Sequence, residues 1–188
     1  MACEITSGFD LGACKDGVGG VRAMYVANWD KVNFSASTVA AGAYTALEMI
    51  AVGDKFFTYN LTKQTSSLTE NITVEPLNST AFFEQTFNLI MNTMSVEKRN
   101  ELTKLVRANV ALIVELNQLG DDGAGNLTVP QYVVLGSRNG CDVNAGTTAS
   151  GVAFGDRNGY DITFSGSEPE SVLYIEKALV DVLIVDKV

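Results

Sequence analysis

The chain has 188 residues and a formal net charge of -9, with 46% hydrophobic and 19% charged residues, which predicts one globular domain with a sizeable core. A chain this acidic is not expected to grip nucleic acid through its phosphates, because that contact needs clustered Lys and Arg. The absence of His removes the commonest general base and zinc ligand.

The first ten residues, MACEITSGFD, lack the basic and apolar regions of a signal peptide. No apolar run approaches the roughly 20 residues of a membrane helix, so we expect no membrane partner. The three cysteines, Cys3, Cys14 and Cys141, have no metal-like spacing. We interpret them as core or free thiols in a reducing compartment, with a Cys3–Cys14 bridge left open.

The N-terminal half is predicted to consist mostly of strands. Val21–Asp30 is apolar and aromatic, and Phe56–Gln64 and Ser67–Pro76 alternate with period two. Tyr44–Val52 is ambiguous because Leu, Glu, Met and Ala also favour a helix. We favour a strand there, since the next strand follows after the hairpin-length gap Gly53–Lys55.

The middle of the chain predicts a strand followed by one amphipathic helix. Phe82–Met91 alternates apolar and polar residues, whereas Ser95–Ala108 lacks Gly and Pro. Ser95 is the predicted N-cap, and Glu97 lies in the first turn, where the helix dipole favours an acid. A narrow apolar stripe is expected to pack this helix on a sheet through Leu102, Leu105 and Val106.

The C-terminal half again reads as strands separated by glycine-containing turns. Asn109–Asn117, Gln131–Ser137 and Tyr160–Ser167 are predicted strands. Asn139-Gly140 is a predicted turn, and Asn158-Gly159 predicts a tight type I′ hairpin turn because that pair tolerates positive φ. The C-terminus is interpreted either as a strand pair or as a short helix followed by a strand.

Several loops resemble chemical sites, but none has the required pattern. Gly151–Glu168 contains glycines and carboxylates, yet a strand follows its glycines where a phosphate loop needs Lys-Ser/Thr entering a helix. Gly120–Asn126 resembles a calcium loop, but Tyr132 stands where an EF-hand needs a bidentate Glu. We therefore expect no catalytic, cofactor-binding or metal-binding residues, and interpret the chain as a non-enzyme that needs no cofactor.

The order of elements resembles the tube-forming structural proteins of tailed bacteriophages, which are related to the type VI secretion tube protein. The residues that carry this resemblance are Phe82–Asn117 and Tyr132–Glu170. Cys3–Val32 is similar to the start of structural proteins in phages of Bacteroidetes-type hosts. No counterpart can be placed for Leu173–Val188.

The resemblance implies a mainly β (α+β) fold, with two packed antiparallel sheets or a flattened barrel and one flanking helix at about residues 95–108. It implies a single domain over residues 1–188, with an N-terminal arm at about 1–18 and a C-terminal extension at about 171–188. Six copies would close into a ring, and rings would stack. The segment Thr62–Ser79 would hold the inter-ring loop, which we place at Gln64, Thr65, Ser66 and Ser67.

The function implied by the resemblance is that of a virion structural protein. It would be made in the host cytoplasm and be a subunit of the bacteriophage tail tube, the conduit for viral genome ejection. Its partners would be copies of itself, other tail or connector proteins, and DNA as a transiting cargo that does not bind. Because strands alternate their faces, Glu75 and Glu84 are the predicted lumen-facing acids, against the alternative of ordinary solvated surface.

Three other functions remain open. The first is a different virion role, as a connector, tail-completion or head-decoration protein. The second is a β-sandwich adhesin or carbohydrate-binding module, in which Trp29, Tyr59 and Tyr132 would form an aromatic platform. The third is a His-free hydrolase that uses paired carboxylates such as Asp121-Asp122 or Glu168/Glu170.

Overall fold

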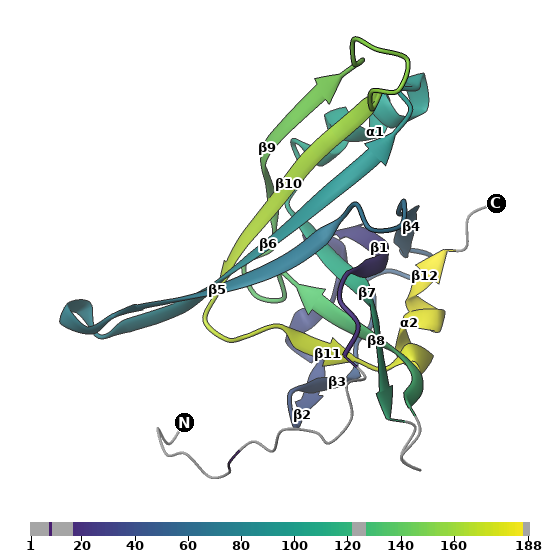
Figure 1. The fold of residues 1–188 in the computed structure, drawn as a ribbon. Helices are drawn as coiled ribbons and strands as arrows, with labels where there is room; N and C mark the ends of the chain where they lie inside the picture. Colours follow the sequence, from purple (N-terminus) through teal and green to yellow (C-terminus); the bar gives the residue numbers. More distant parts are fainter. Residues whose placement is uncertain (1–7, 9–16, 122–126, 186–188) are drawn as a thin grey trace.

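The computed structural model describes residues 8, 17–121 and 127–185, and within these ranges the chain is mainly β (Figure 1). The described strands form an eight-stranded sheet, here called the large sheet, with the order β12-β4-β1-β7-β8-β11-β3-β2. The small sheet has four strands in the order β5-β6-β10-β9. This confirms the predicted mainly β, α+β class, and both sheets are open rather than closed into a barrel.

The elements alternate between the two sheets along the chain. The large sheet contains β1 (Val21–Asn28), β2 (Thr38–Ala40), β3 (Ala43–Ala46), β4 (Phe56–Asn60), β7 (Val110–Asp121), β8 (Leu127–Leu135), β11 (Leu173–Ile175) and β12 (Ile184–Val185). The small sheet contains β5 (Ser67–Glu75), β6 (Thr80–Asn92), β9 (Asp142–Ala149) and β10 (Gly159–Glu168). The helical elements are η1 (Trp29–Lys31), η2 (Phe34–Ala36), η3 (Pro76–Asn78), α1 (Val96–Leu105) and α2 (Lys177–Leu183).

The main core lies between the two sheets. Phe87 and Leu89 of β6 are fully buried there, as are Ile162 and Phe164 of β10, because each strand turns every second side chain inward. Across from them, the large sheet contributes Met24, Val26, Leu112, Val114, Val133 and Leu135. The period-two patterns in the sequences of β6 and β10 therefore predict correctly which side chains of the small sheet point into the core.

A second core covers the opposite face of the large sheet. Here Tyr25, Ile113 and Val134 pack with Val180 and Leu183 of α2, and Phe34 and Trp29 close the cluster at its margin. The central strands are therefore buried on both faces. This double burial explains why β7 reads as the continuous apolar run VALIV rather than as an alternating strand.

The C-terminal segment is part of the large sheet rather than an extension, which corrects that prediction. β11 pairs antiparallel with β8 and parallel with β3, and β12 pairs parallel with β4. Between them, α2 buries Val180 and Leu183. For the C-terminus, the interpretation as a short helix followed by a strand is confirmed by α2 and β12. The described fold therefore has a second helix beside the single one that was predicted.

The predicted hairpin around Gly53–Lys55 is wrong. Of the expected strand Tyr44–Val52, only Tyr44–Ala46 lies in a named strand, β3. This strand pairs with β2 and β11, whereas β4 pairs with β1 and β12. β3 and β4 therefore lie in distant parts of the same sheet. The reason is tertiary, because β3 forms a hairpin with the preceding strand β2 and pairs with the distant β11, whereas β4 pairs with β1 and β12.

Some predictions fall on residues that are not described. The expected N-terminal arm lies outside the described residues apart from Gly8, Gly17 and Val18, and so do Cys3 and Cys14. Most of the loop Gly120–Asn126, including Asp122, is likewise outside. Cys141 is a buried free thiol in the main core, and burial raises its pKa to about 12.

Candidate assembly surfaces

The outer face of the small sheet, which points away from the core, is polar and acidic. Along β5, β6 and β10 the ladder places hydroxyl and amide side chains side by side on it, namely Ser67, Thr69, Asn71, Thr73, Thr86, Asn88, Thr163, Ser165 and Ser167. The four strands contain no Lys or Arg at all. The charged groups that these strands place on the outer face are therefore carboxylates. The cation that pairs with one of them, Arg157, comes from a loop.

Glu75 and Glu84 both lie on this outer face, and their lumen-facing role stays a prediction. Glu84 stands opposite Asn71 on one side and Ser167 on the other, and Glu75 stands opposite Thr80, which shares the face of Glu84. Both side chains are exposed. The Glu75 carboxylate also accepts a long hydrogen bond, 3.4 Å, from the Leu77 nitrogen in η3.

Two aspartates extend the same acidic face. Asp161 accepts a hydrogen bond from Asn88 Nδ2 at 2.8 Å and pairs with Arg157 Nη2 at 3.3 Å. Arg157 comes from the loop before β10, and Asp142 at the start of β9 is exposed. The face therefore consists mainly of hydroxyls and amides with carboxylates spaced across it, and it also carries Phe82 and Ile90.

The small sheet has two long free edges in the described structure. β5 and β9 each pair on one side only, with β6 and β10 respectively, and span nine and eight residues. The edges of the large sheet are short, three residues in β2 and two in β12. Since short edge strands resist pairing with other chains and long ones invite it, β5 and β9 are the natural sites for strand addition.

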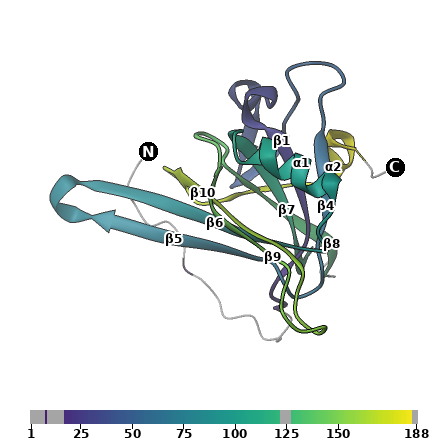
Figure 2. The same cartoon turned by 90° about the horizontal axis from the view of Figure 1, so that it is seen from above.

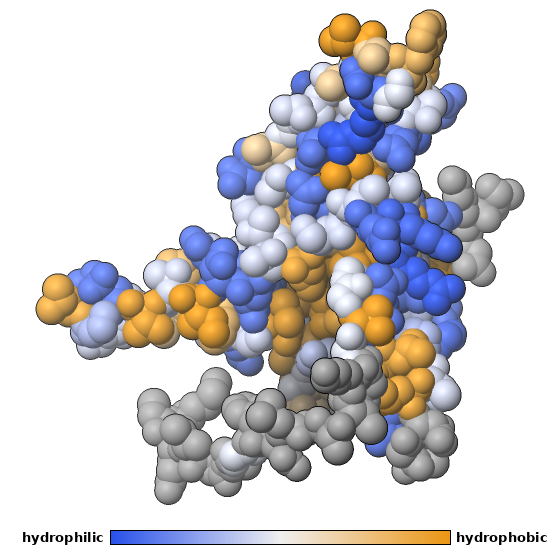
Figure 3. Space-filling view, viewed as in Figure 1, coloured by the Kyte–Doolittle hydropathy of each residue, from blue (hydrophilic) through white to orange (hydrophobic). Residues whose placement is uncertain are grey.

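The β5–β6 hairpin extends well beyond the body of the protein (Figures 1 and 2). The last residue of β6 toward the hairpin tip that pairs with β10 is Phe83, so residues 72–82 form a two-stranded arm that ends in η3. Ile72, Val74 and Leu77 on this arm are 67%, 61% and 93% exposed. Figure 3 shows separate apolar patches along the projecting arm.

The predicted inter-ring loop precedes the arm in the chain, and its role between rings stays a prediction. Gln64, Thr65, Ser66 and Ser67 lie where β4 connects to β5, and Ser66 is buried, with its hydroxyl accepting a hydrogen bond from the Ile90 nitrogen at 3.2 Å. Ser66 is therefore held inside the fold by its burial and by this bond. The projecting part of Thr62–Ser79 is the arm instead.

Helix α1 forms as predicted, but its apolar stripe is narrower. Ser95 Oγ accepts a hydrogen bond from Lys98 N at 3.2 Å and caps the helix. Leu105 is buried in the main core and Leu102 packs against it, whereas Val106 is 56% exposed, which corrects its assignment to the packing face. The helix ends at Leu105, so the chain turns away before Val106 could complete a stripe.

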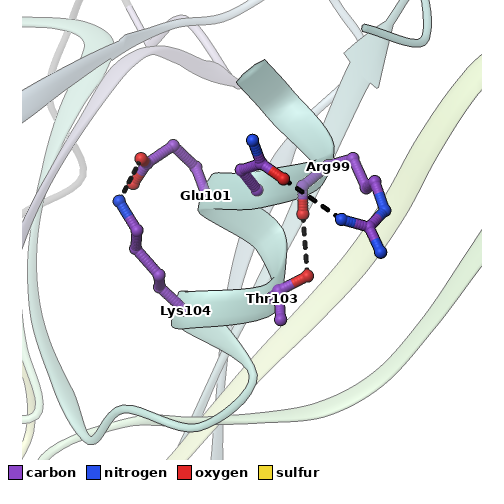
Figure 4. Close-up of polar contacts among 5 residues, drawn as sticks. Arg99, Glu101, Thr103 and Lys104 are labelled. Carbon is purple, nitrogen blue, oxygen red and sulfur yellow. Dashed lines mark hydrogen bonds and ion pairs between the residues drawn. The ribbon is translucent and has the colours of Figure 1, made fainter. Parts of the chain in front are cut away.

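The exposed side of α1 is highly polar (Figure 4). Lys104 Nζ lies 2.7 Å from Glu101 Oε1, and on another side of the helix Thr103 donates to the Arg99 carbonyl at 2.9 Å. The Glu97 pKa is lowered by hydrogen bonds from its own backbone nitrogen and from Ser95. α1 thus presents charged groups to solvent and only a small apolar edge to the core.

The tight turn predicted at Asn158 and Gly159 is wrong. Neither residue has positive φ, and the connection from β9 to β10 spans residues 150–158, with Asp156 accepting hydrogen bonds from Val152 N and Ala153 N, both at 2.8 Å. Gly159 is needed for a different reason. A Cβ at this position would lie 2.0 Å from the Met91 carbonyl oxygen, so only glycine fits beside β6.

In the described part of the chain, the residues behind the alternative functions do not gather into sites. Tyr132 is buried in the second core, where Trp29 packs at the margin, while Tyr59 packs against the main core on the other side of the large sheet. They therefore form no shared platform. The buried Glu168 carboxylate accepts hydrogen bonds from the backbone nitrogens of Arg138 and Asn139, at 2.9 Å in the shortest case, and so holds a turn.

One buried polar cluster was not expected from the sequence. Glu115, in the middle of an apolar run, accepts a hydrogen bond from the Tyr25 hydroxyl at 3.1 Å and lies 3.6 Å from Arg22 Nε. Burial, followed by the Glu115 charge, raises the pKa of Tyr25 above its ordinary range and that of Tyr132 to about 12. These partners account for Glu115 as a structural group of the second core.

No family model, curated protein or solved structure matches this chain. Among the described residues, no cluster of three or more Cys, Asp or Glu side chains could hold a metal ion. No helix in the described ranges is long and apolar enough to cross a membrane. The surfaces that distinguish the molecule are therefore the acidic outer face, the free edges of β5 and β9, and the arm.

Proposed function

We propose that the protein is a virion structural protein, a subunit of a phage tail tube or ring that conducts DNA. The observation that carries the proposal is the small sheet, which combines two long free edges with an acidic face whose strands contain no Lys or Arg. The free edges offer a way to join copies, and the face offers a wall along which DNA can move.

The strand order favours addition of one copy to the next. Neighbouring strands of the small sheet run antiparallel, so β5 and β9, at opposite edges of four strands, run in opposite directions. When copies are related by rotation about an axis parallel to the strands, corresponding strands keep the same direction. The β9 edge of one copy would therefore meet the β5 edge of the next antiparallel, continuing the ladder, and closure into a ring would pair every long edge.

The charge of the outer face suits a DNA conduit. Phosphate contacts with Lys and Arg release counterions and make DNA bind, whereas carboxylates offer no such gain. In a ring closed through β5 and β9, this face would form one continuous wall. Glu75 and Glu84 would then line the lumen together with Asp142 and Asp161.

Size-exclusion chromatography with light scattering, combined with negative-stain imaging, tests the proposal. We expect closed rings, with stacked tubes at higher concentration. A single ring that never stacks would point to a connector or tail-completion role instead. A protein that stays monomeric at every concentration would contradict the assembly proposal.

A further inference from the structure

A small hollow lies under the free edge strand β9, on the side of the small sheet that faces the core. It has a volume of about 260 Å³ and is lined by β9 from Val143 to Thr148, by Ile162 of β10, and by Leu102 and Val106 at the end of α1. No charged side chain lines it in the part of the chain that the structure describes. The hollow is smaller than typical small-molecule pockets of about 300–1,000 Å³, so its size suits a few aliphatic side chains.

Two features leave this hollow open. Gly146 stands opposite the core-facing Ile162 and has no side chain to fill the space beneath β9. Val106 lines the hollow and is 56% exposed although it is apolar. A further strand added to the β9 edge would extend the sheet over this space and bring its own core-facing side chains to the hollow.

The other edge strand, β5, has exposed apolar side chains on its core-facing side. Leu68 stands opposite Phe87 of the main core, so alternation places Ile72 and Val74 on that same side of β5. Both side chains are more than half exposed. Within one chain β6 and β10 lie between β5 and β9, so β5 can cover this hollow only in another copy (Figure 1).

Closing the small sheets of several copies into a ring requires a stagger along the strands, because strands of closed sheets tilt by about 35–45° from the axis. Neighbouring strands lie about 4.8 Å apart, and each residue rises about 3.3 Å along a strand. The four strands of one copy therefore accumulate a stagger of roughly 13–19 Å, or about four to six residues, before the next copy begins.

One row of residues across the small sheet gives the reference for this stagger. The ladder joins Ser67 of β5 through Asn88 and Thr163 to Ala145 of β9. Without stagger, Ser67 of one copy would stand opposite Ala145 of its neighbour, and only the first few residues of β5 would meet β9. The outer edge of the arm would then stay unpaired.

A stagger toward the arm tip brings the exposed apolar side chains to the hollow. Because side chains alternate, only even shifts keep the core-facing side chains of both strands on one side of the sheet. A shift of about six residues sets Ile72 opposite Gly146, and a shift of about four sets it opposite Val143. Both shifts place Ile72 on the hollow and extend the pairing along the arm.

We propose that the arm of each copy closes the ring sideways: β5 pairs with β9 of the next copy in this staggered register, and Ile72, with Val74 beside it, fills the hollow against Val106. The inference rests on the ring proposed above and specifies its seam. Thr73 and Glu75 stay on the outer face in this register, so the seam buries apolar side chains on one side of the sheet and leaves polar ones on the other.

Engineered cysteines test the register in the assembled full chain. Ala145→Cys is combined, in separate proteins, with Thr73→Cys, Asn71→Cys or Ser67→Cys, and Ala145→Cys alone gives the background from the native cysteines. These side chains all point to the outer face, away from the hollow. Oxidation should link the Thr73→Cys or the Asn71→Cys protein into covalent dimers and larger multimers, because directly opposite residues of an antiparallel pair lie within disulfide reach.

The other crosslinking results would contradict the staggered seam. Links formed mainly by the Ser67→Cys protein would show that the strands meet without stagger. Equal yields from all three proteins, or no yield above the background from any of them, would overturn the proposal as well.

Variants on the two sides of the hollow test its filling. Ile72→Ser combined with Val74→Ser removes the side chains proposed to enter it, and Val106→Ser changes its lining. Each should raise the concentration needed for ring formation at least about tenfold. Leu77→Ser is the matched control, because Leu77 is an exposed apolar residue of the same arm that lies in η3, beyond β5, and this variant should form rings like wild type.

The outcomes separate this inference from the proposed function. Normal ring formation by both the Ile72→Ser, Val74→Ser protein and the Val106→Ser protein would overturn the filled hollow and leave the ring proposal standing. An equal loss of rings with Leu77→Ser would assign the effect to the arm as a whole and also overturn the filled hollow. A wild-type protein that never leaves the monomeric state would overturn both proposals.

Discussion

The side-chain oxygen of Gln85 accepts a hydrogen bond from the backbone nitrogen of Gly136 at 3.1 Å, and this bond joins the small sheet to the large one. Gln85 is 2% exposed and points inward from β6, in line with Phe87 and Leu89. Its Nε2 faces Glu70 Oε1 at 3.5 Å, and Glu70 in turn accepts from Val172 N at 2.9 Å. The polar residue thus links β5, β6 and the end of β8 at the base of the arm.

Gln85→Leu should destabilise the protein although it adds an apolar side chain to a buried position. The Gly136 nitrogen would lose its partner, and a buried unsatisfied donor costs about 1–3 kcal/mol. Thr86→Ala, on the outer face of the same strand, should cost under about 0.5 kcal/mol. Urea unfolding of both variants measures the difference, and equal costs would mean that the Gln85 bond contributes nothing.

Gly159→Ala should destabilise the small sheet by about 1–3 kcal/mol or more, because its Cβ would lie 2.0 Å from the Met91 carbonyl oxygen and backbone atoms cannot move aside easily. Gly155→Ala is the control, since a Cβ there meets nothing within 4 Å and the residue does not need positive φ. That variant should stay within about 0.5 kcal/mol of wild type in thermal and chemical unfolding. A neutral Gly159→Ala would show that β6 and β10 are farther apart here.

Leu105→Ala should cost about 2–5 kcal/mol, because Leu105 is 7% exposed in the main core and its removal leaves a cavity. Val106→Ala and Lys104→Ala, its two neighbours, should each cost under about 0.5 kcal/mol. Chemical denaturation of the three variants decides which side of α1 packs. A large loss of stability from Val106→Ala would instead support the apolar packing face expected from the sequence.

Local sequence signals predict some elements of this fold and miss others. The strands β6 and β10 and the helix α1 were predictable because alternation and capping are local signals that agree with their tertiary surroundings. β9 was missed because DVNAGTTA has only one large apolar residue, Val143, and its pairing with β10 makes it a strand. The turn prediction at Asn158-Gly159 was also wrong because of a contact distant in sequence. The close approach of β6 is what requires glycine at position 159.

The candidate surfaces were partly predictable. The ladder places Glu75 and Glu84 on one exposed face, and the lumen-facing role expected from the sequence stays a prediction. The free edges of β5 and β9 follow from strand order, which no local pattern encodes. The arm could not be predicted from the sequence, because its length depends on where β10 stops pairing with β6, at Phe83.

The protein should lose stability in alkali through tyrosines that are neutral in the fold. Burial, aided by the Glu101 charge, raises the pKa of Tyr59 from 10.0 to about 12, and Tyr132 is raised similarly by burial and Glu115. Above pH 10 the unfolded chain releases phenolic protons that the fold retains, so the free energy of unfolding should fall as pH rises from about 10 to about 12. Tyr59→Phe with Tyr132→Phe should show a shallower fall in urea unfolding over this range, and an unchanged slope would refute the shifts.

The last prediction concerns the acidic outer face and DNA. Assembled wild-type protein should not retain DNA at low salt, because the face offers carboxylates to phosphates. Glu75→Lys combined with Glu84→Lys should retain it, and added salt should release it steeply, as expected for phosphate contacts. Glu48→Lys combined with Glu176→Lys adds the same charge at exposed positions outside the small sheet and should not retain DNA inside the tube. Filter binding with imaging of the tubes measures all three samples. Tight binding by wild type would contradict the conduit, and equal retention by both double variants would show that net charge, rather than this face, controls the contact.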